Sequence, residues 1–68
     1  MNKFAERFKE LLKERNLTQY SFAKKFGFPK ETVNSWCKGQ SRPNIDTVVL
    51  ICKELDESSD YLLGVKDI

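Results

Sequence analysis

Histidine is absent from this sequence, and cysteine, glycine and proline are scarce, with two, three and two copies respectively. Cys37 and Cys52 are 15 positions apart, and without a CxxC pair or a histidine they cannot complete a four-ligand zinc site within one chain. We therefore expect two reduced, partly buried thiols and neither a metal nor another cofactor. There is also no glycine-rich phosphate loop and no plausible pair of nucleophile and base, which argues against an enzyme.

Long apolar runs are missing as well. No stretch approaches the roughly 20 residues that span a membrane, and residues 2–15 are too strongly interrupted by charges to be a signal peptide. We expect a cytoplasmic protein with no membrane partner. Strand-like alternation, repeats and low-complexity segments are absent too, so the 68 residues are expected to form a single small domain, residues 1–68, with one core.

Charged residues are distributed unevenly along the sequence. The net charge is only +2, but residues 18–44 carry five basic side chains against one acidic, whereas residues 45–68 carry two basic against six acidic. A polyanion would bind the basic segment, and the acidic end would face away from it.

The spacing of apolar residues predicts a first helix over about 2–15, with a stripe formed by Phe4, Phe8, Leu11, Leu12 and Arg15. Asn16 should end it, since Asn tolerates the left-handed conformation. Thr18 is the expected N-cap of a second helix, about 19–26, and Gly27 is the expected left-handed residue that ends that helix.

A third helix should begin at Pro29 or Lys30 and run to residue 38, because proline is well tolerated at a first helical position. Asn44 is the expected N-cap of a fourth helix, about 45–55, and Ser58 that of a short last helix, about 59–63, closed by Gly64. The apolar set of the fourth helix is Ile45, Val48, Val49, Ile51, Cys52 and Leu55.

The segment 18–36 is the most informative part of the chain. Its apolar residues are Phe22, Phe26, Phe28, Val33 and Trp36, and the small Ala23 stands where a second helix must cross closely. These sizes, together with the glycine turn, indicate a helix-turn-helix suited to a DNA major groove. Trp36 could serve as a stacking platform, but its helical spacing with Val33 favours the core.

The chain resembles the phage-repressor and Cro-like helix-turn-helix proteins of the XRE family over about residues 4–64. The resemblance implies an all-α, compact five-helix, lambda-repressor-like DNA-binding domain with its helix-turn-helix at the second and third helices. Two departures stand out: Pro29 replaces a common Ser or Thr cap, and Cys37 replaces a common Glu. The motifs that carry the resemblance are Leu17-Thr18-Gln19, Phe22-Ala23, Phe26-Gly27-Phe28, Thr32-Val33-Asn34-Ser35-Trp36, Lys38-Gly39, Arg42-Pro43 and Ser58-Ser59-Asp60-Tyr61-Leu62-Leu63-Gly64.

On a helical wheel the third helix separates Thr32, Val33 and Trp36, which we expect in the core, from an exposed polar face. Lysine can donate to guanine, glutamate can accept from cytosine, and asparagine can bind adenine with two hydrogen bonds. The plainer alternative is a solvated helix face. The candidate base-reading residues are Lys30, Glu31, Asn34 and Ser35.

A second group should bind the DNA backbone. The resemblance makes Gln19 a phosphate contact at the start of the second helix, although it could be a solvated first-turn residue. Arg42 is the strongest candidate in the loop after the third helix because charge drives backbone affinity, whereas Ser41 could belong to a plain loop. The candidate phosphate-binding residues are Gln19, Lys38, Gln40, Ser41 and Arg42.

We thus expect a sequence-specific DNA-binding transcriptional regulator, with repression the favoured mode. One recognition helix reads few base pairs, so a homodimer on an inverted-repeat operator is expected, joined through Tyr61, Leu63, Val65 and Ile68. Four residues follow Gly64, which leaves no room for an effector domain, so no small-molecule effector is expected. The alternatives are an antitoxin or controller subunit, or a protein-interaction module, which would carry an acidic or apolar face on its third helix.

Overall fold

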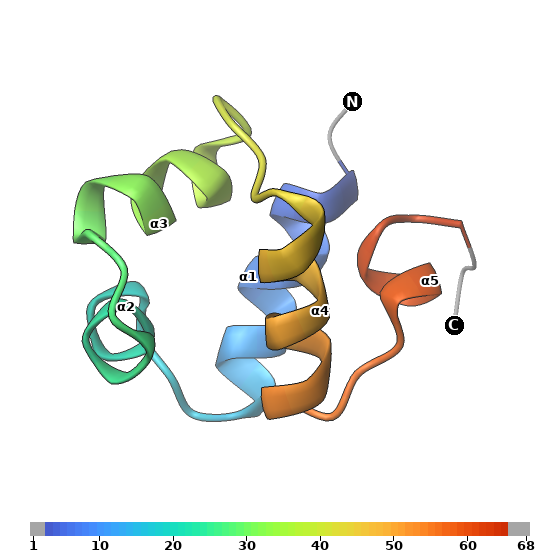
Figure 1. Ribbon diagram of the computed structural model, residues 1–68, viewed down its shortest axis with the longest axis horizontal. Coiled ribbons are helices and arrows are strands. Elements are labelled where there is room, and N and C mark those ends of the chain that lie inside the picture. The colour runs from blue at the N-terminus through green and yellow to red at the C-terminus, as the bar shows by residue number, and fades with distance from the viewer. Residues whose placement is uncertain (1–2, 66–68) are drawn as a thin grey trace.

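A computed structural model describes residues 3–65, and over that range the chain forms five helices and no strand (Figure 1). The expected all-α architecture with a helix-turn-helix at the second and third helices is confirmed. The first, fourth and fifth helices end one residue earlier than the sequence predicts. The helices are α1 (Lys3–Glu14), α2 (Gln19–Phe26), α3 (Lys30–Lys38), α4 (Ile45–Glu54) and α5 (Ser59–Leu62).

Side chains that precede the helices fix where most of them begin. The Thr18 hydroxyl accepts a hydrogen bond from the Ser21 N–H at 3.0 Å, and the Ser21 hydroxyl accepts one from the Thr18 N–H at 2.8 Å, which makes a reciprocal capping box. Asn44 caps α4 and Ser58 caps α5, as expected. Pro29, by contrast, offers α3 no side-chain cap. The start of α3 therefore depends on tertiary packing more than the starts of α2, α4 and α5 do.

Left-handed residues end α1, α2 and α3. Asn16 has φ 58°, confirming that this Asn stops α1. Gly27 and Gly39 have φ 78° and 77°, a conformation that glycine adopts without steric cost. The amide that follows the first of these glycines, that of Phe28, donates back to the carbonyl of Ala23 at 2.9 Å, which closes the tight turn between α2 and α3.

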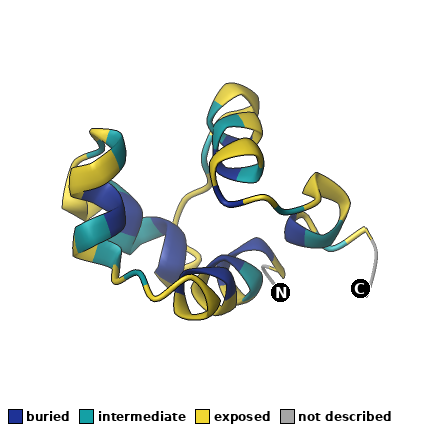
Figure 2. Cartoon of the chain, turned by 90° about the horizontal axis from the view of Figure 1, so that it is seen from below, coloured by how far each residue is buried: buried dark blue, intermediate teal, exposed yellow. Residues whose placement is uncertain are grey.

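The core is built around α1, which packs against both α3 and α5, while α2 packs on α3 and α4 on α5. Figure 2 shows the buried segments of these helices facing the inside of the bundle. Phe8 is fully buried, with its ring centroid 5.3 Å from that of Phe4, 5.2 Å from Phe22 and 6.0 Å from Trp36. Trp36 is only 4% exposed, so its expected place in the core is confirmed.

Arg7 of α1 and Arg15, the residue that follows α1, bind carbonyl groups between the end of α4 and α5. The Arg15 guanidinium donates to the carbonyl oxygen of Leu55 at 2.6 and 3.0 Å and to that of Asp56 at 3.2 Å. Arg7 donates to the carbonyl oxygen of Tyr61 at 2.7 Å, and its guanidinium carbon lies 4.5 Å from the centre of that ring. Arg15 thus continues the apolar stripe of α1 in space but acts through polar contacts.

The apolar set of α4 is only partly buried. Val48, Ile51 and Leu55 form the row that faces the core, whereas Ile45 is 81% exposed and Val49 is 48% exposed. Positions 45 and 49 are one helical turn apart and lie beside the buried row, on a side that the other helices of residues 3–65 leave exposed. The spacing of apolar residues in the sequence could not show which of these two rows is buried and which is exposed.

The thiols lie as expected. Cys37 is buried, Cys52 is half-buried, and both are free. Loss of solvent contact raises the pKa of the Cys37 thiol, an effect that the nearby charge of Lys9 opposes in part.

Candidate nucleic-acid interface

The orientation of α3 is set by its buried side. Val33, Trp36 and Cys37 are at most 4% exposed and point into the bundle. Thr32, which we expected in the core, is only half-buried, because it lies at the edge of the inward face in the first turn of the helix. With these positions turned inward, the opposite side of α3 is left facing outward as a polar surface.

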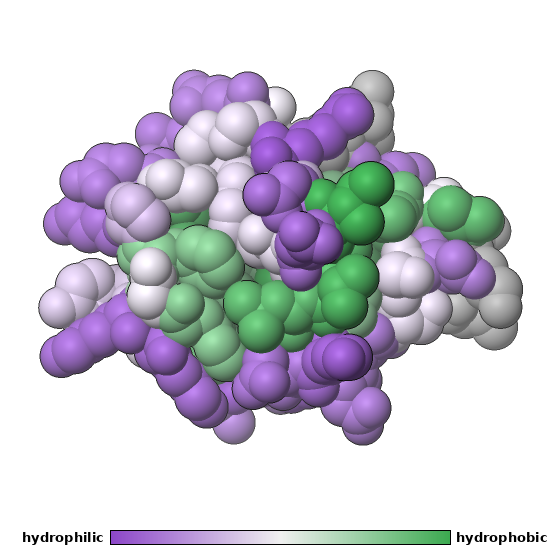
Figure 3. All heavy atoms as spheres, in the orientation of Figure 1, coloured by the Kyte–Doolittle hydropathy of each residue, from purple (hydrophilic) through white to green (hydrophobic). Residues whose placement is uncertain are grey.

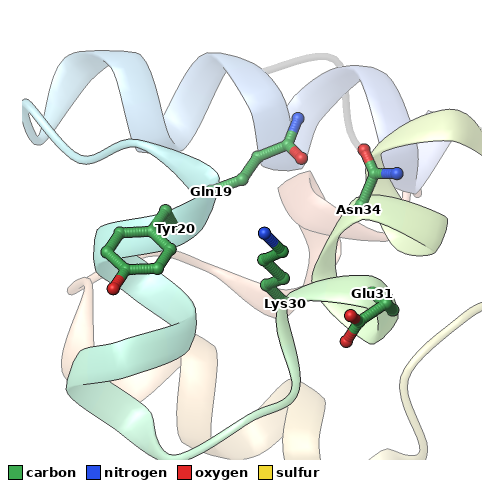
Figure 4. A pocket seen from close by; sticks show the side chains of 5 residues that line it. All are labelled: Gln19, Tyr20, Lys30, Glu31 and Asn34. Atoms are coloured by element: carbon green, nitrogen blue, oxygen red, sulfur yellow. The ribbon is translucent and has the colours of Figure 1, made fainter.

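An open hollow lies between the first turns of α2 and α3 (Figure 4). Figure 4 shows the amide of Gln19 extending toward that of Asn34 across it, with the ammonium group of Lys30 below Gln19. The carboxylate of Glu31 lies beyond Lys30 on the α3 side. The fold therefore brings together one predicted phosphate contact and three predicted base readers. The hollow is lined by Gln19, Tyr20, Lys30, Glu31 and Asn34.

These residues differ in how firmly the fold holds them. Lys30 and Glu31 are exposed, whereas Gln19 and Asn34 are half-buried. Asn34 is thus less exposed than the helical wheel suggests, because it lies next to α2 across the hollow. A half-buried amide has fewer rotamers to lose on contact with a partner.

Ser35 and Ser41 lie together at the other end of α3. Their hydroxyl oxygens are 2.7 Å apart, a hydrogen bond that links the last turns of α3 to the loop that follows it. Ser35 is half-buried and does not line the hollow. The sequence did not indicate this pairing, which joins a candidate base reader to a candidate phosphate contact.

The remaining predicted phosphate contacts, Lys38, Gln40 and Arg42, are exposed near this same end of α3 and in the loop. Gln19 stands at the opposite end, beside the hollow. The candidate backbone contacts therefore flank the candidate base readers on both sides, which is the arrangement needed for a helix placed across a groove between two phosphate strands.

The charges on this part of the molecule are not neutralised. Among residues 3–65, none of the five basic side chains of segment 18–44 forms an ion pair. They are Lys24, Lys25, Lys30, Lys38 and Arg42.

Within residues 3–65 no group of histidine, cysteine, aspartate or glutamate side chains is arranged to hold a metal ion. None of the helices in that range combines the length and the apolar character needed to cross a membrane.

Tyr20 is the one lining residue that the sequence did not single out. It is 61% exposed and lies in the first turn of α2, next to Gln19. The available signal was that its position in α2 does not share the inward face of the buried Phe22 and the half-buried Phe26. One aromatic residue off the inward face is common on protein surfaces, however.

Known proteins share both this sequence pattern and this fold. The family described as Helix-turn-helix matches residues 8–62. Two uncharacterized HTH-type transcriptional regulators of Bacillus subtilis (strain 168), YobD and YqaE, are 30% and 35% identical to the chain over 94% and 88% of its length. The chain spans only 57% and 52% of the length of these relatives.

A solved structure shows the same arrangement of helices. The crystal structure of a transcriptional regulator from Listeria innocua superimposes with a TM-score of 0.83 at 26% identity, covering 94% of this chain and 60% of the other. Because the family match covers most of the sequence and the fold agrees, this chain belongs to the XRE-type helix-turn-helix family.

Proposed function

We propose that this chain binds double-stranded DNA in a sequence-specific manner, as the DNA-reading part of a transcriptional regulator. The observation that carries the proposal is the outward face of α3, where polar side chains gather around one hollow. It lies in segment 18–44, whose five cations form no ion pair within residues 3–65. The names of the relatives, which are transcriptional regulators, support it. The proposal gives the chain no catalytic role.

In this proposal α3 enters the major groove. Base edges are contacted by the α3 residues that line the hollow, Lys30, Glu31 and Asn34. Lysine donates hydrogen bonds to guanine, glutamate accepts from cytosine, and asparagine pairs with adenine. Ser35 uses the hydrogen-bonding capacity that its pair with Ser41 leaves, since a hydroxyl has one donor and two acceptor positions. The backbone is held at both ends, by Gln19 on one side and by Lys38, Gln40, Ser41 and Arg42 on the other.

A second copy of the chain is the proposed partner on DNA. The apolar residues of α4 that miss the core, Ile45 and Val49, lie along a groove that also contains Pro43 and the 51% exposed Leu63. Figure 3 shows apolar surface over the middle of this face, where α4 lies in Figure 1, and again at the α5 side. Two such faces would cover each other around a two-fold axis, which suits an inverted-repeat operator.

This surface differs from the one that the sequence suggests. The ring of Tyr61 lies against Arg7, and its hydroxyl donates to Glu10 at 3.2 Å, so Tyr61 is engaged within the chain. Ile68 lies outside the described residues. Val65 is 74% exposed and remains part of the proposed dimer surface. The face is small, so we propose that the dimer forms mainly on DNA, and that operator occupancy blocks transcription.

The proposed division between base readers and backbone contacts can be tested with two variants after binding-site selection from random DNA. Arg42→Ala should weaken binding to all sequences about equally and reduce the salt-dependence slope by roughly one. Asn34→Ala should cost about 1–3 kcal/mol on the selected site and little on unrelated DNA. Lys53→Ala, which removes an exposed cation of α4, is the charge control.

Two results would count against this assignment. If both variants lost specific and non-specific binding in the same proportion, the division into base-reading residues and backbone contacts would be wrong. Failure of the selection to enrich any sequence would reject the proposed function and favour a protein-interaction role for the fold.

The dimer is tested by Ile45→Asp, which places a charge in the proposed surface without touching the core. Binding to the inverted repeat should weaken, because two copies would bury that charge, whereas binding to an isolated half-site should be unchanged. Footprinting should protect two half-sites about 34 Å apart. A single protected half-site with one bound chain at saturation would refute the dimer.

A further inference from the structure

Tyr20 is an exposed aromatic residue within the proposed reading face. The other large hydrophobic residues that are exposed among residues 3–65 all lie on or after α4, toward the proposed dimer surface. A single exposed apolar residue needs no special explanation. The position of Tyr20 is what distinguishes it, because every other residue that lines the same hollow is charged or carries an amide.

The ring of Tyr20, and not its hydroxyl, is the part that borders the hollow. Figure 4 shows the edge of the ring facing Lys30, while the hydroxyl points away from both Lys30 and Glu31. The hollow thus has one apolar wall, on α2, opposite side chains of α3 that donate and accept hydrogen bonds.

The major groove of DNA offers one feature that matches such a wall. Base edges there carry hydrogen-bond donors and acceptors, and thymine alone among the four bases adds a methyl group, at C5. That methyl group lies on the outer side of the base, beside the backbone of its own strand. A residue in the first turn of α2, next to the proposed phosphate contact Gln19, is placed at that edge of the groove.

We propose that Tyr20 is a specificity-determining residue that reads thymine, with its ring packed against the C5-methyl group of a thymine next to the base bound by Lys30. This inference rests on the proposed function and adds to it a base-reading contact from α2, outside the recognition helix. The preferred half-site therefore contains a thymine whose methyl group contributes to affinity. Burial of one methyl group corresponds to about a fourfold change in Kd.

The experiment compares the selected operator with duplexes in which deoxyuridine replaces thymidine one position at a time, which removes only the methyl group. For the native chain, the substitution that removes this methyl group from one half-site should raise Kd about fourfold. Tyr20→Ala should bind the two duplexes equally, whereas Tyr20→Phe, which keeps the ring, should retain the native preference. Tyr20 is 61% exposed, so both variants are expected to fold, and circular dichroism checks this.

Lys24→Ala, another exposed position of α2, is the matched control and should keep the fourfold preference for thymine. The inference is overturned if no uridine substitution weakens binding by the native chain, or if Tyr20→Ala keeps the full uridine penalty. It is also overturned if Tyr20→Phe and Tyr20→Ala weaken binding equally on both duplexes, which would assign the hydroxyl to a phosphate. If no operator can be selected, the proposed function fails and this inference fails with it, whereas an operator indifferent to uridine rejects the inference alone.

Discussion

Replacement of Arg15 by alanine should destabilise the domain through the end of α4, without changing the core. The guanidinium donates three hydrogen bonds, two to the carbonyl oxygen of Leu55 and one to that of Asp56. These carbonyl groups lie at the C-terminal end of α4, where intrahelical partners run out. Asp56 also has φ 53°, a conformation that a non-glycine residue adopts only where its surroundings hold it.

The size of the effect follows from these contacts. A hydrogen bond to a charged group contributes about 1.5–3 kcal/mol when it is shielded from water. The Arg15 side chain is 35% exposed, so water would replace part of what is lost. We therefore expect a loss of about 2 kcal/mol, to which the cation at the negative end of the helix contributes a part. Arg15→Lys keeps the charge but not the forked donor geometry, and should lose about 1 kcal/mol.

Urea and thermal unfolding measure this loss. For a domain of this size, about 2 kcal/mol corresponds to a decrease in Tm of roughly 8–16 °C, with the urea m-value unchanged. Lys9→Ala removes an exposed cation from α1, the helix that Arg15 follows, and should change Tm little. If Arg15→Ala and Lys9→Ala proved equally stable, the contacts to Leu55 and Asp56 would contribute nothing and the reasoning would be refuted.

Three further outcomes are expected. Gly64→Ala should lower the free energy of unfolding, measured in urea, because a Cβ there would lie 2.7 Å from Cβ of Lys3 and the backbone has φ 84°. Unchanged stability would show that α1 and the turn after α5 can move apart at no cost. Thr18→Ala should cost about 1 kcal/mol by removing one half of the capping box, and Thr18→Ser, which keeps the hydroxyl, should cost much less. Because burial raises the pKa of the Cys37 thiol, the stability that its neutral form contributes should be present at neutral pH and decline in alkaline solution, as the thiolate becomes favoured in the unfolded chain. Alkylation of Cys37 should accordingly be slow in the native protein and fast in urea, and equal rates would contradict its burial.

The features that the sequence predicts correctly are those determined within a few residues. Thr18 and Asn44 cap their helices through the amide three positions on, and Asn16 and Gly27 end theirs by their own backbone freedom. Each of these signals acts over less than two helical turns. For this reason the helix boundaries could be read with an error of about one residue.

The features that the sequence does not predict are set by contacts between distant segments. Ile45 and Val49 have the same spacing as core residues, and only the placement of α4 against its neighbours leaves them exposed. Arg15 reaches a carbonyl 40 residues away, which no local pattern encodes. At the candidate interface, Lys30 and Asn34 could be chosen by residue type, whereas Tyr20 becomes a candidate only once α2 and α3 enclose the hollow.

The position of α1 has a consequence for the operator itself. Because α1 contacts both α3 and α5, and α5 packs on α4, α1 links the helix of the proposed reading face to the helices that carry the proposed dimer surface and so constrains the angle between them. In a two-fold dimer that angle fixes how far apart, and in what helical phase, the two recognition helices reach the DNA. The number of base pairs between half-sites would then be determined by packing around Phe8, at the centre of the core. Relatives with identical reading residues but different side chains in α1 would prefer operators that differ in spacing and share the same half-site sequence.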